Sequence, residues 1–278
     1  MISMIAGVRR RRARWHAWGL MWIGVWPLGV AVAAPLEIKL LFLGTADSSA
    51  HRGAQQGLEE ANAQGEFLGQ HYRLVVAAPV ARSHADASAL VVAGKDSALL
   101  KIAASNPALP VLNVGSDSDQ LRTTCRANLL HVLPSRKMLT DALAQWHTAH
   151  PEATGIQARA WHARFDKYSA SQLNKRYQEK FKTAMDDQAW AGWAAVKLIS
   201  DLIAREQTAD GQKLLKALRT DLKFDGQKGI EMSFRATGQL RQPLLLVAED
   251  RVVGEAPVRG VVEIENLDSL GATACAHQ

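Results

Sequence analysis

The stretch IKLLFLGTADSSAHRGAQQGLEEANAQG, residues 38–65, places an apolar run, a polar loop and a helix-like run in direct succession. The run at 38–43 is short and apolar, which predicts a buried strand. The run at 50–64 carries small apolar residues at helical spacing and meets Gly65, which predicts a helix that stops there. A strand, a loop and a helix form the repeating unit of parallel α/β sheets.

The loop in this unit, GTADSSAHRG at 44–53, has two interpretations. It lacks the Gly-x-x-x-x-Gly-Lys-Ser/Thr pattern of a P-loop and the Gly-x-Gly-x-x-Gly pattern of a dinucleotide site. Its hydroxyl groups lie between a strand end and a helix start, where free N–H groups bind carboxylates and other polar groups. The loop is therefore a ligand loop, through Thr45, Ser48 and Ser49, or a helix N-cap formed by Asp47 or Ser48.

The first half of the chain repeats the strand–helix alternation. Ser135 has the side chain of an N-cap and precedes a helix with one apolar face, made by Met138, Leu139, Ala142, Leu143 and Trp146. The alternation predicts an α/β fold with a parallel sheet flanked by helices. The expected strands are 38–43, 72–77, 89–92, 109–114 and 129–132, and the further expected helices are 96–105 and the one after Ser135.

A second polar loop, GSDSDQLR at 115–122, follows the predicted strand 109–114. Because the carboxyl ends of parallel strands meet at one edge of a sheet, we expect this loop beside the first one. Two hydroxyl-rich loops at one edge form a small-molecule cleft, whereas the spacing of a calcium loop is absent. The predicted ligand-binding residues are Thr45, Ser48, Ser49, Gly115, Ser116, Asp117 and Trp190.

The second half of the chain is mainly helical, with helices expected at 169–181, 185–205 and 213–222. The middle one has a broad apolar stripe, which predicts that it lies on the sheet. Trp190 either flanks this stripe or faces the cleft and stacks on a solute. Apolar runs on both sides of Thr237–Gly238 predict a C-terminal β-hairpin.

The first 33 residues have the pattern of a secretory signal peptide. A group of arginines precedes an uncharged stretch, and Ala31-Val32-Ala33 matches a small-x-small cleavage site. The stretch is short for a membrane span, although an uncleaved N-terminal anchor is the alternative. Cleavage would leave a protein exported to the periplasm.

The basic charge of the chain belongs to this segment. Five of the 33 Lys and Arg residues, and no Asp or Glu, lie in residues 1–33, which leaves 28 basic against 27 acidic residues. A net charge near +1 without a basic stripe argues against a nucleic-acid partner.

Cys125 and Cys275 are the two cysteines of the chain. In an oxidising compartment they are expected to pair, and two unpaired thiols are the alternative. A metal site needs more ligands than these two supply, so no metal is expected. No cofactor is expected either. His162 with Asp166 could act as a general base, but no nucleophile motif accompanies them, so no catalytic residue is assigned and the chain is expected not to be an enzyme.

Several segments resemble a known family. LEIKLLFLGTADSSAHRGAQQGLEEANAQGEFLGQHYRLV and PVLNVGSDSDQLR resemble the first strand, fourth strand and ligand loops of periplasmic solute-binding proteins of branched-chain amino acid ABC transporters, the leucine-binding-protein type. More specific likeness is to a subgroup found with pyrroloquinoline-quinone (PQQ)-dependent alcohol dehydrogenase systems. It lies in NLLHVLPSRKMLTDALAQW, AWAGWAAVKLISDLI, FDGQKGIEMSFRATGQLRQPLLLV and NLDSLG.

The resemblance implies the type I periplasmic-binding-protein fold with a Rossmann-like lobe. It also implies a small polar ligand held by hydroxyls and backbone N–H groups. Relatives have two lobes, and the chain crosses to the second lobe after the helix that matches 135–148. Here the later family segments begin after only the short segment 149–168, so the second lobe is expected to be missing. The expected division is a signal peptide at 1–33 and a single lobe at 34–278, with βα repeats at 34–148, a linker at 149–168, and helices and hairpin at 169–278.

Three functions follow as alternatives. The first is a periplasmic solute-binding component of an ABC transporter or of a PQQ-dependent alcohol oxidation system, with an ABC permease or a dehydrogenase as partner. The second is an accessory protein that docks a dehydrogenase, a cytochrome or a second copy of itself without binding a solute. A polar concavity at the strand-end edge favours the first, and a large apolar patch there favours the second. The third, a hydrolase using His162, lacks a nucleophile motif.

Overall fold

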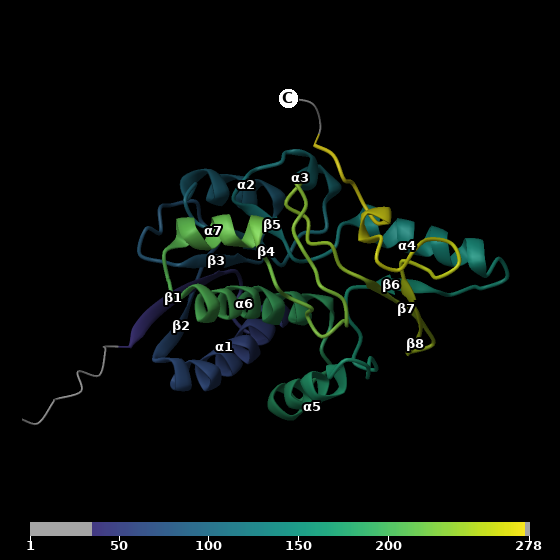
Figure 1. The fold of residues 1–278 in the computed structure, drawn as a ribbon, viewed down its shortest axis with the longest axis horizontal. Coiled ribbons are helices and arrows are strands. Elements are labelled where there is room, and N and C mark those ends of the chain that lie inside the picture. Colours follow the sequence, from purple (N-terminus) through teal and green to yellow (C-terminus); the bar gives the residue numbers. More distant parts are fainter. Residues whose placement is uncertain (1–34, 276–278) are drawn as a thin grey trace, which may run out of the picture. The chain divides into compact units, whose positions relative to one another are not determined.

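The computed structural model describes residues 35–275, and the predicted signal peptide lies outside the described residues. Figure 1 shows strands and helices alternating through the first half of this part. The strands are β1 (Leu36–Leu43), β2 (Gln70–Ala77), β3 (Ala89–Val92), β4 (Val111–Asn113), β5 (Leu129–His131), β6 (Gln157–Arg159), β7 (Leu244–Ala248) and β8 (Arg251–Ala256). The helices are α1 (Ser49–Leu68), α2 (Asp96–Ser105), α3 (Asp119–Thr123), α4 (Arg136–Ala149), α5 (Ala170–Phe181), α6 (Asp187–Glu206), α7 (Gly211–Thr220) and the 3₁₀ turn η1 (Leu267–Ser269).

The first five strands form one parallel sheet in the order β2-β1-β3-β4-β5, as the alternation predicts. Helices α1, α6 and α7 cover one face, and α2 and α3 cover the other. Burial on both faces explains why the central strands are continuous apolar runs rather than alternating ones. On β1, for example, Leu40 and Phe42 face the first set of helices, and Leu41 and Leu43 face the second.

Helices α1 and α6 pack with their backbones in close approach. A Cβ atom on Gly53 would lie 1.8 Å from the carbonyl oxygen of Ala189, and one on Gly192 would lie 2.0 Å from the carbonyl oxygen of Ala50. Glycine is therefore required at both positions. The contact sets the amino-terminal end of α6 beside that of α1, at the carboxyl edge of the sheet.

A second, antiparallel sheet has the order β6-β7-β8. Met138 and Ala142 of α4 pack against Leu244 and Leu246 of β7. The apolar face predicted for the helix after Ser135 is therefore confirmed, but it covers this sheet and not the parallel one. Figure 1 shows α4 running beside β6, β7 and β8. The alternate β7 side chains join the main core, so the two sheets share a hydrophobic core.

The hairpin lies later in the chain than the sequence predicts. Strands β7 and β8 are joined by Glu249 and Asp250, both with positive φ, of 46° and 62°. Two positive φ values in a two-residue loop match the right-handed twist of the flanking strands. Around Thr237–Gly238 the structure forms an isolated antiparallel bridge between Phe234 and Leu240 instead.

Helix α1 also runs past its predicted end. Gly65 lies inside the helix, and a Cβ atom there would be 2.4 Å from the carbonyl oxygen of Gln70. The helix ends at Leu68, and Gly69 follows with φ 64° as a left-handed cap. Gly65 is therefore a packing glycine and Gly69 is the stop signal.

The segment 149–168, expected to be a linker, contains β6 and so contributes a strand to the second sheet. Residues 35–275 fall within one compact unit. The absence of a second lobe remains a prediction.

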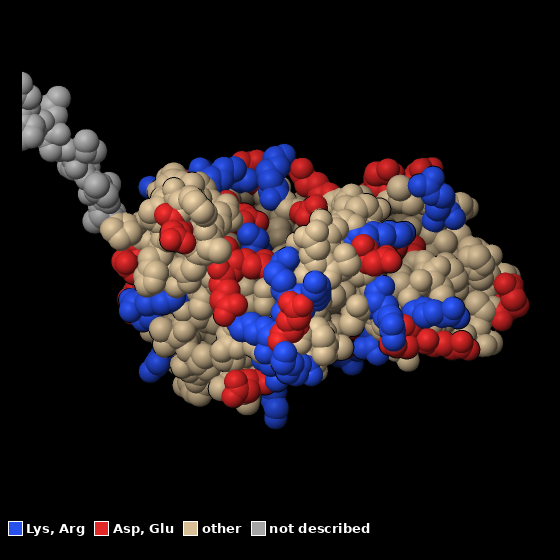
Figure 2. Space-filling view, turned by 90° about the horizontal axis from the view of Figure 1, so that it is seen from below, with Lys and Arg blue, Asp and Glu red and all other residues tan. Residues whose placement is uncertain are grey.

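Cys125 and Cys275 form a disulfide, with their Cα atoms 5.8 Å apart, as expected. It ties the C-terminal segment to the turn after α3. None of the helices within residues 35–275 is long and apolar enough to cross a membrane. Figure 2 shows acidic and basic side chains interspersed over the face in view, without a stripe of one sign.

Candidate functional site

The loops that follow β1, β3 and β4 meet in one open cleft of about 740 Å³ at the carboxyl edge of the parallel sheet. We call it the rim cleft. The amino-terminal end of α6 completes it. Its lining residues are Thr45, Ser48, Ala93, Gly94, Lys95, Asp96, Ser97, Gly115, Ser116, Asp117 and Gln188.

The loop after β1 is held by its own helix. The Ser48 side chain accepts a hydrogen bond from the backbone N–H of His51 at 3.3 Å and so caps α1. The backbone N–H of Asp47, a residue with φ 58°, donates to Nδ1 of His51 at 3.0 Å. Thr45 is exposed and lines the cleft. Ser48 therefore both caps the helix and faces the cleft.

The loop after β4 is shaped by a buried asparagine. The Asn113 side-chain oxygen accepts from the backbone N–H groups of Gly115 and Ser116, at 3.1 and 2.9 Å. Its amide nitrogen donates to the Ser116 carbonyl at 2.7 Å. A Cβ atom on Gly115 would lie 2.8 Å from Cα of Ala93, so the loops after β3 and β4 approach through this glycine.

A buried arginine fixes the same loop from behind. Arg122 of α3 donates to the carbonyls of Ser116 and Ser118, at 3.0 and 2.9 Å, and to the carbonyl of Leu133 at 2.7 Å. Burial lowers the pKa of Arg122 to about 10, against the opposing effect of nearby aspartates. The guanidinium thus serves as a multidentate backbone clamp.

Asp96 provides a fixed negative charge in the cleft. The Ser116 hydroxyl donates to its carboxylate at 2.6 Å. Burial raises the pKa of Asp96, but hydrogen bonds from Ser116 and Ser118 and the charges of Arg122 and Arg136 outweigh it, so the pKa lies below its usual value. Asp96 is therefore ionised at neutral pH.

Donors lie beside this charge. Lys95 is exposed and occupies the N-cap position of α2, where its side chain makes no capping hydrogen bond. The first N–H groups of α2 have no partner inside the helix, and the positive end of the helix dipole adds to the charge of Lys95. Asp117, half-exposed, lies 3.5 Å from Arg136 on the other side. The cleft thus offers both positive and negative groups to a small zwitterion.

Five of the seven predicted ligand-binding residues line the rim cleft: Thr45, Ser48, Gly115, Ser116 and Asp117. Ser49 does not, because its hydroxyl donates to Asp186. Trp190 is fully buried and its indole N–H donates to the carbonyl of Gly226 at 3.2 Å, so it is a core residue and does not stack on a solute in the cleft.

The sequence interpretation missed a third loop, Gly94–Ser97, and Gln188 of α6. The signal for that loop was present, because it connects a predicted strand with a predicted helix. Gln188 reaches the cleft through the close packing of α6 on α1, which no local pattern reveals. Within residues 35–275 no cluster of three or more His, Cys, Asp or Glu residues could hold a metal ion.

No family model matches the chain, and no curated protein matches it. Solved structures do. The fold is that of the type I periplasmic binding proteins. A branched-chain amino acid ABC transporter periplasmic ligand-binding protein from Burkholderia xenovorans LB400 aligns with a TM-score of 0.64 and 13% identity, over 79% of this chain and 95% of that one.

Two further solved structures contain bound amino acids. An ABC transporter substrate-binding protein from Desulfitobacterium hafniense in complex with Leu aligns with a TM-score of 0.62 and 12% identity, over 78% of this chain and 99% of that one. The branched-chain amino acid transporter substrate-binding protein of Streptococcus pneumoniae, in complex with isoleucine, aligns with a TM-score of 0.57 and 11% identity. The alignment covers 80% of this chain and 98% of that one. At these identities the likeness establishes the fold.

Proposed function

We propose that the chain is a periplasmic solute-binding protein of an ABC transporter or of a PQQ-dependent alcohol oxidation system, and that it has no catalytic step. A small polar solute, amino-acid-like or alcohol-derived, binds in the rim cleft. The observation that carries the proposal is the convergence of three strand-end loops on one polar cleft. The fold shared with proteins solved with Leu and isoleucine supports it.

The charges of the cleft favour a zwitterion. A solute carboxylate would face Lys95 and the amino-terminal end of α2, where N–H groups and the helix dipole favour an anion. A solute ammonium would face Asp117, because Asp96 already accepts from Ser116. Hydroxyls of Thr45 and Ser97 supply further hydrogen bonds.

The cleft is expected to bind weakly. Every lining residue comes from the loops of the parallel sheet or from α6, and none comes from β6, β7 or β8. Tight small-molecule sites bury most of the ligand surface, whereas an open cleft lined only from the parallel-sheet side does not. Weak binding suits a protein that hands its solute to a permease or a periplasmic dehydrogenase.

Docking of a dehydrogenase, a cytochrome or a second copy without a solute is the second candidate. A large apolar patch at the carboxyl edge would favour it. Eight of the eleven residues that line the rim cleft have polar side chains instead, with Lys95, Asp96 and Asp117 among hydroxyl groups. Solute binding therefore ranks first.

The test is thermal unfolding of the mature protein against amino acids, short alcohols, aldehydes, acids and quinone cofactors at millimolar concentration. A ligand that binds only the folded state raises the midpoint in a saturable way. The variants Ser116→Ala and Lys95→Gln should reduce the shift. Lys101→Gln is the control, because it removes the same charge from an exposed site on α2 outside the cleft.

Two results would contradict the proposal. One is a flat midpoint across the whole panel. The other is a saturable shift that survives in Ser116→Ala and Lys95→Gln, which would place the solute elsewhere. A flat panel together with capture of a purified dehydrogenase or cytochrome by the mature chain would support the docking function.

A further inference from the structure

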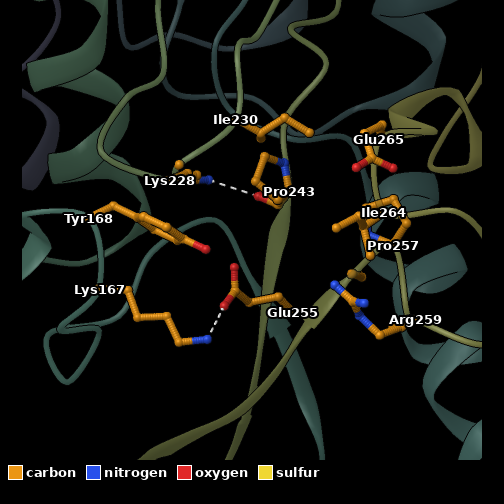
Figure 3. A pocket seen from close by; sticks show the side chains of 12 residues that line it. Lys167, Tyr168, Lys228, Ile230, Pro243, Glu255, Pro257, Arg259, Ile264 and Glu265 are labelled. Carbon is orange, nitrogen blue, oxygen red and sulfur yellow. Dashed lines mark hydrogen bonds and ion pairs between the residues drawn. The ribbon is translucent and has the colours of Figure 1, made fainter.

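A second cavity, of about 390 Å³, lies where the segment 225–230, the end of β8 and the loop before α5 meet. We call it the Lys228 cavity. Figure 3 shows its side chains, which come from four separate stretches of the chain. It shares no lining residue with the rim cleft. The lining residues are Lys167, Tyr168, Lys228, Gly229, Ile230, Pro243, Glu255, Ala256, Pro257, Arg259, Ile264 and Glu265.

Lys228 is a buried ammonium, with 2% of the residue exposed. It donates to the side-chain oxygen of Gln242 at 2.8 Å and to the carbonyl of Pro243 at 3.0 Å. It also lies over the Trp190 ring, 3.9 Å from the centroid. All three neighbours are neutral, and no carboxylate of the described part of the chain lies within ion-pair distance of it.

The carboxylates on the cavity wall do not offset this charge. Glu255 forms an ion pair with Lys167 at 2.7 Å, so the two neutralise each other. Glu265 is exposed. Arg259 is exposed too, and it has no ion-pair partner within residues 35–275. In Figure 3 the Lys228 nitrogen points toward Pro243, to which it donates, and the Tyr168 hydroxyl points toward the Glu255 carboxylate. When Lys228 is protonated, the cavity wall carries three positive groups and two carboxylates, so its net charge is positive.

The rest of the wall is apolar. Ile230, Pro243, Pro257 and Ile264 line the cavity, and Ile264 is 37% exposed. The volume lies within the range of small-molecule sites, which combine apolar walls with a few fixed polar groups. Such a wall suits an apolar body, and the unpaired positive charge suits an anionic head group.

We propose that the Lys228 cavity is a second ligand site, and that it takes a small apolar carboxylate. The carboxylate lies toward Lys228, Arg259 and the Tyr168 hydroxyl. The apolar part of the ligand lies against Ile230, Pro243 and Ile264. Hydrogen bonds between a carboxylate and charged donors are stronger than those between neutral groups, so the anionic head supplies the specificity.

The experiment is isothermal titration calorimetry of the mature chain with hexanoate and with hexanamide, its neutral isostere. Hexanoate should bind and hexanamide should bind at least about tenfold more weakly, the order expected for a lost charge-assisted hydrogen bond. Arg259→Gln and Tyr168→Phe, both at exposed positions, should each weaken hexanoate binding. Arg251→Gln is the matched control, because it removes an exposed arginine of β8 outside the cavity.

A pH series adds a readout that a surface site would not give. Burial lowers the pKa of Lys228 to about 7, against the opposing effects of Asp187 on α6 and Glu255 on β8. Lys167, Arg259 and Glu265 are the other charged groups of the wall. If the carboxylate requires a protonated Lys228, hexanoate affinity falls between pH 6 and pH 8.5, by up to roughly 30-fold.

Three results would overturn the proposal: equal binding of hexanoate and hexanamide, unchanged affinity in both Arg259→Gln and Tyr168→Phe, or an equal loss in Arg251→Gln. Ser116→Ala separates the two sites. It should reduce the shift caused by the rim-cleft solute and leave hexanoate binding unchanged, so failure of one proposal does not decide the other.

Discussion

The rim cleft and the Lys228 cavity present polar groups in opposite ways. In the rim cleft the polar groups are hydroxyls, helix N–H groups and loop charges, and the loops are held by hydrogen bonds to Asn113 and from Arg122. In the Lys228 cavity the central group is one ammonium among neutral partners. The first site depends on backbone geometry, whereas the second depends on a single protonation state.

The largest effect is expected where backbones touch in the half that carries the rim cleft. Gly53→Ala would place a Cβ atom 1.8 Å from a backbone oxygen of α6, so the two helices must separate. We expect a loss of about 3 kcal/mol or more in the free energy of unfolding, measured by urea titration with tryptophan fluorescence.

Gly254→Ala is the counterpart in the antiparallel sheet. Its Cβ atom would meet the Trp146 ring, 2.5 Å from Cζ3, and not a backbone atom. Because a half-buried side chain can move, we expect a loss of about 1 kcal/mol. Equal losses in Gly53→Ala and Gly254→Ala would show that the α1–α6 contact and the antiparallel sheet accommodate a Cβ atom equally well. The contrast between the two regions would then be wrong.

The next effect concerns the clamp behind the rim cleft. Arg122→Met leaves the buried carbonyls of Ser116, Ser118 and Leu133 without this donor, which should cost about 3 kcal/mol of unfolding free energy. Arg122→Lys should rescue only part, because an ammonium cannot reproduce the guanidinium fork. Solute binding in the rim cleft should weaken in both variants, whereas hexanoate binding in the Lys228 cavity should not change, and calorimetry on both ligands checks this.

The parallel sheet and most of the rim cleft could be predicted from the sequence, because both depend on local patterns. Buried strands read as apolar runs, and α2 lies at 96–105 as expected. The loops at 44–49 and 115–117 contain hydroxyls at strand ends, so their place in the cleft follows from topology. Ser135 caps α4 as its side chain and position indicate.

The remaining features depend on tertiary contacts that no local pattern carries. Strand β6 has three residues, Gln157–Arg159, of which one is buried, so it has no detectable period. Gly65 resembles a helix stop but serves close packing on Gln70. Lys228 and Arg122 are charged residues in the core, and pattern analysis places charged residues at the surface. The Lys228 cavity was therefore invisible in the sequence.

The pH dependence of stability should distinguish the region around Lys228 from the parallel sheet. The pKa of Lys228 is 10.5 in an ordinary environment and about 7 in the fold, because burial disfavours the ammonium. Between these values the unfolded chain binds the proton and the folded chain does not, so the free energy of unfolding rises with pH. The slope is at most about 1.4 kcal/mol per pH unit, and Lys228→Met should remove it.

His131 of β5 is the corresponding group in the parallel sheet. Burial lowers its pKa well below 6.5, with a smaller effect from Arg122, so its contribution to stability is present above pH 6.5 and is lost as the pH falls. His131→Gln should therefore flatten the acid side, and Lys228→Met the alkaline side. Denaturation midpoints from pH 4 to pH 9.5 check both, and a single variant that flattens both sides would contradict the assignment.

The smallest expected effect on stability is the loss of one serine cap, either at α1 or at α4. Ser48 accepts from His51 at 3.3 Å to cap α1, and Ser135 accepts from Met138 at 3.2 Å to cap α4. Replacing either serine by alanine should cost about 1 kcal/mol of unfolding free energy.

The two variants should differ in binding, because Ser48 also lines the rim cleft and Ser135 does not. Once stability is matched by temperature, Ser48→Ala should lower solute affinity and Ser135→Ala should leave it unchanged. A loss of affinity in Ser135→Ala would mean that the capped start of α4 is coupled to the cleft through Arg136 and Asp117, and that the two halves of the molecule do not act independently.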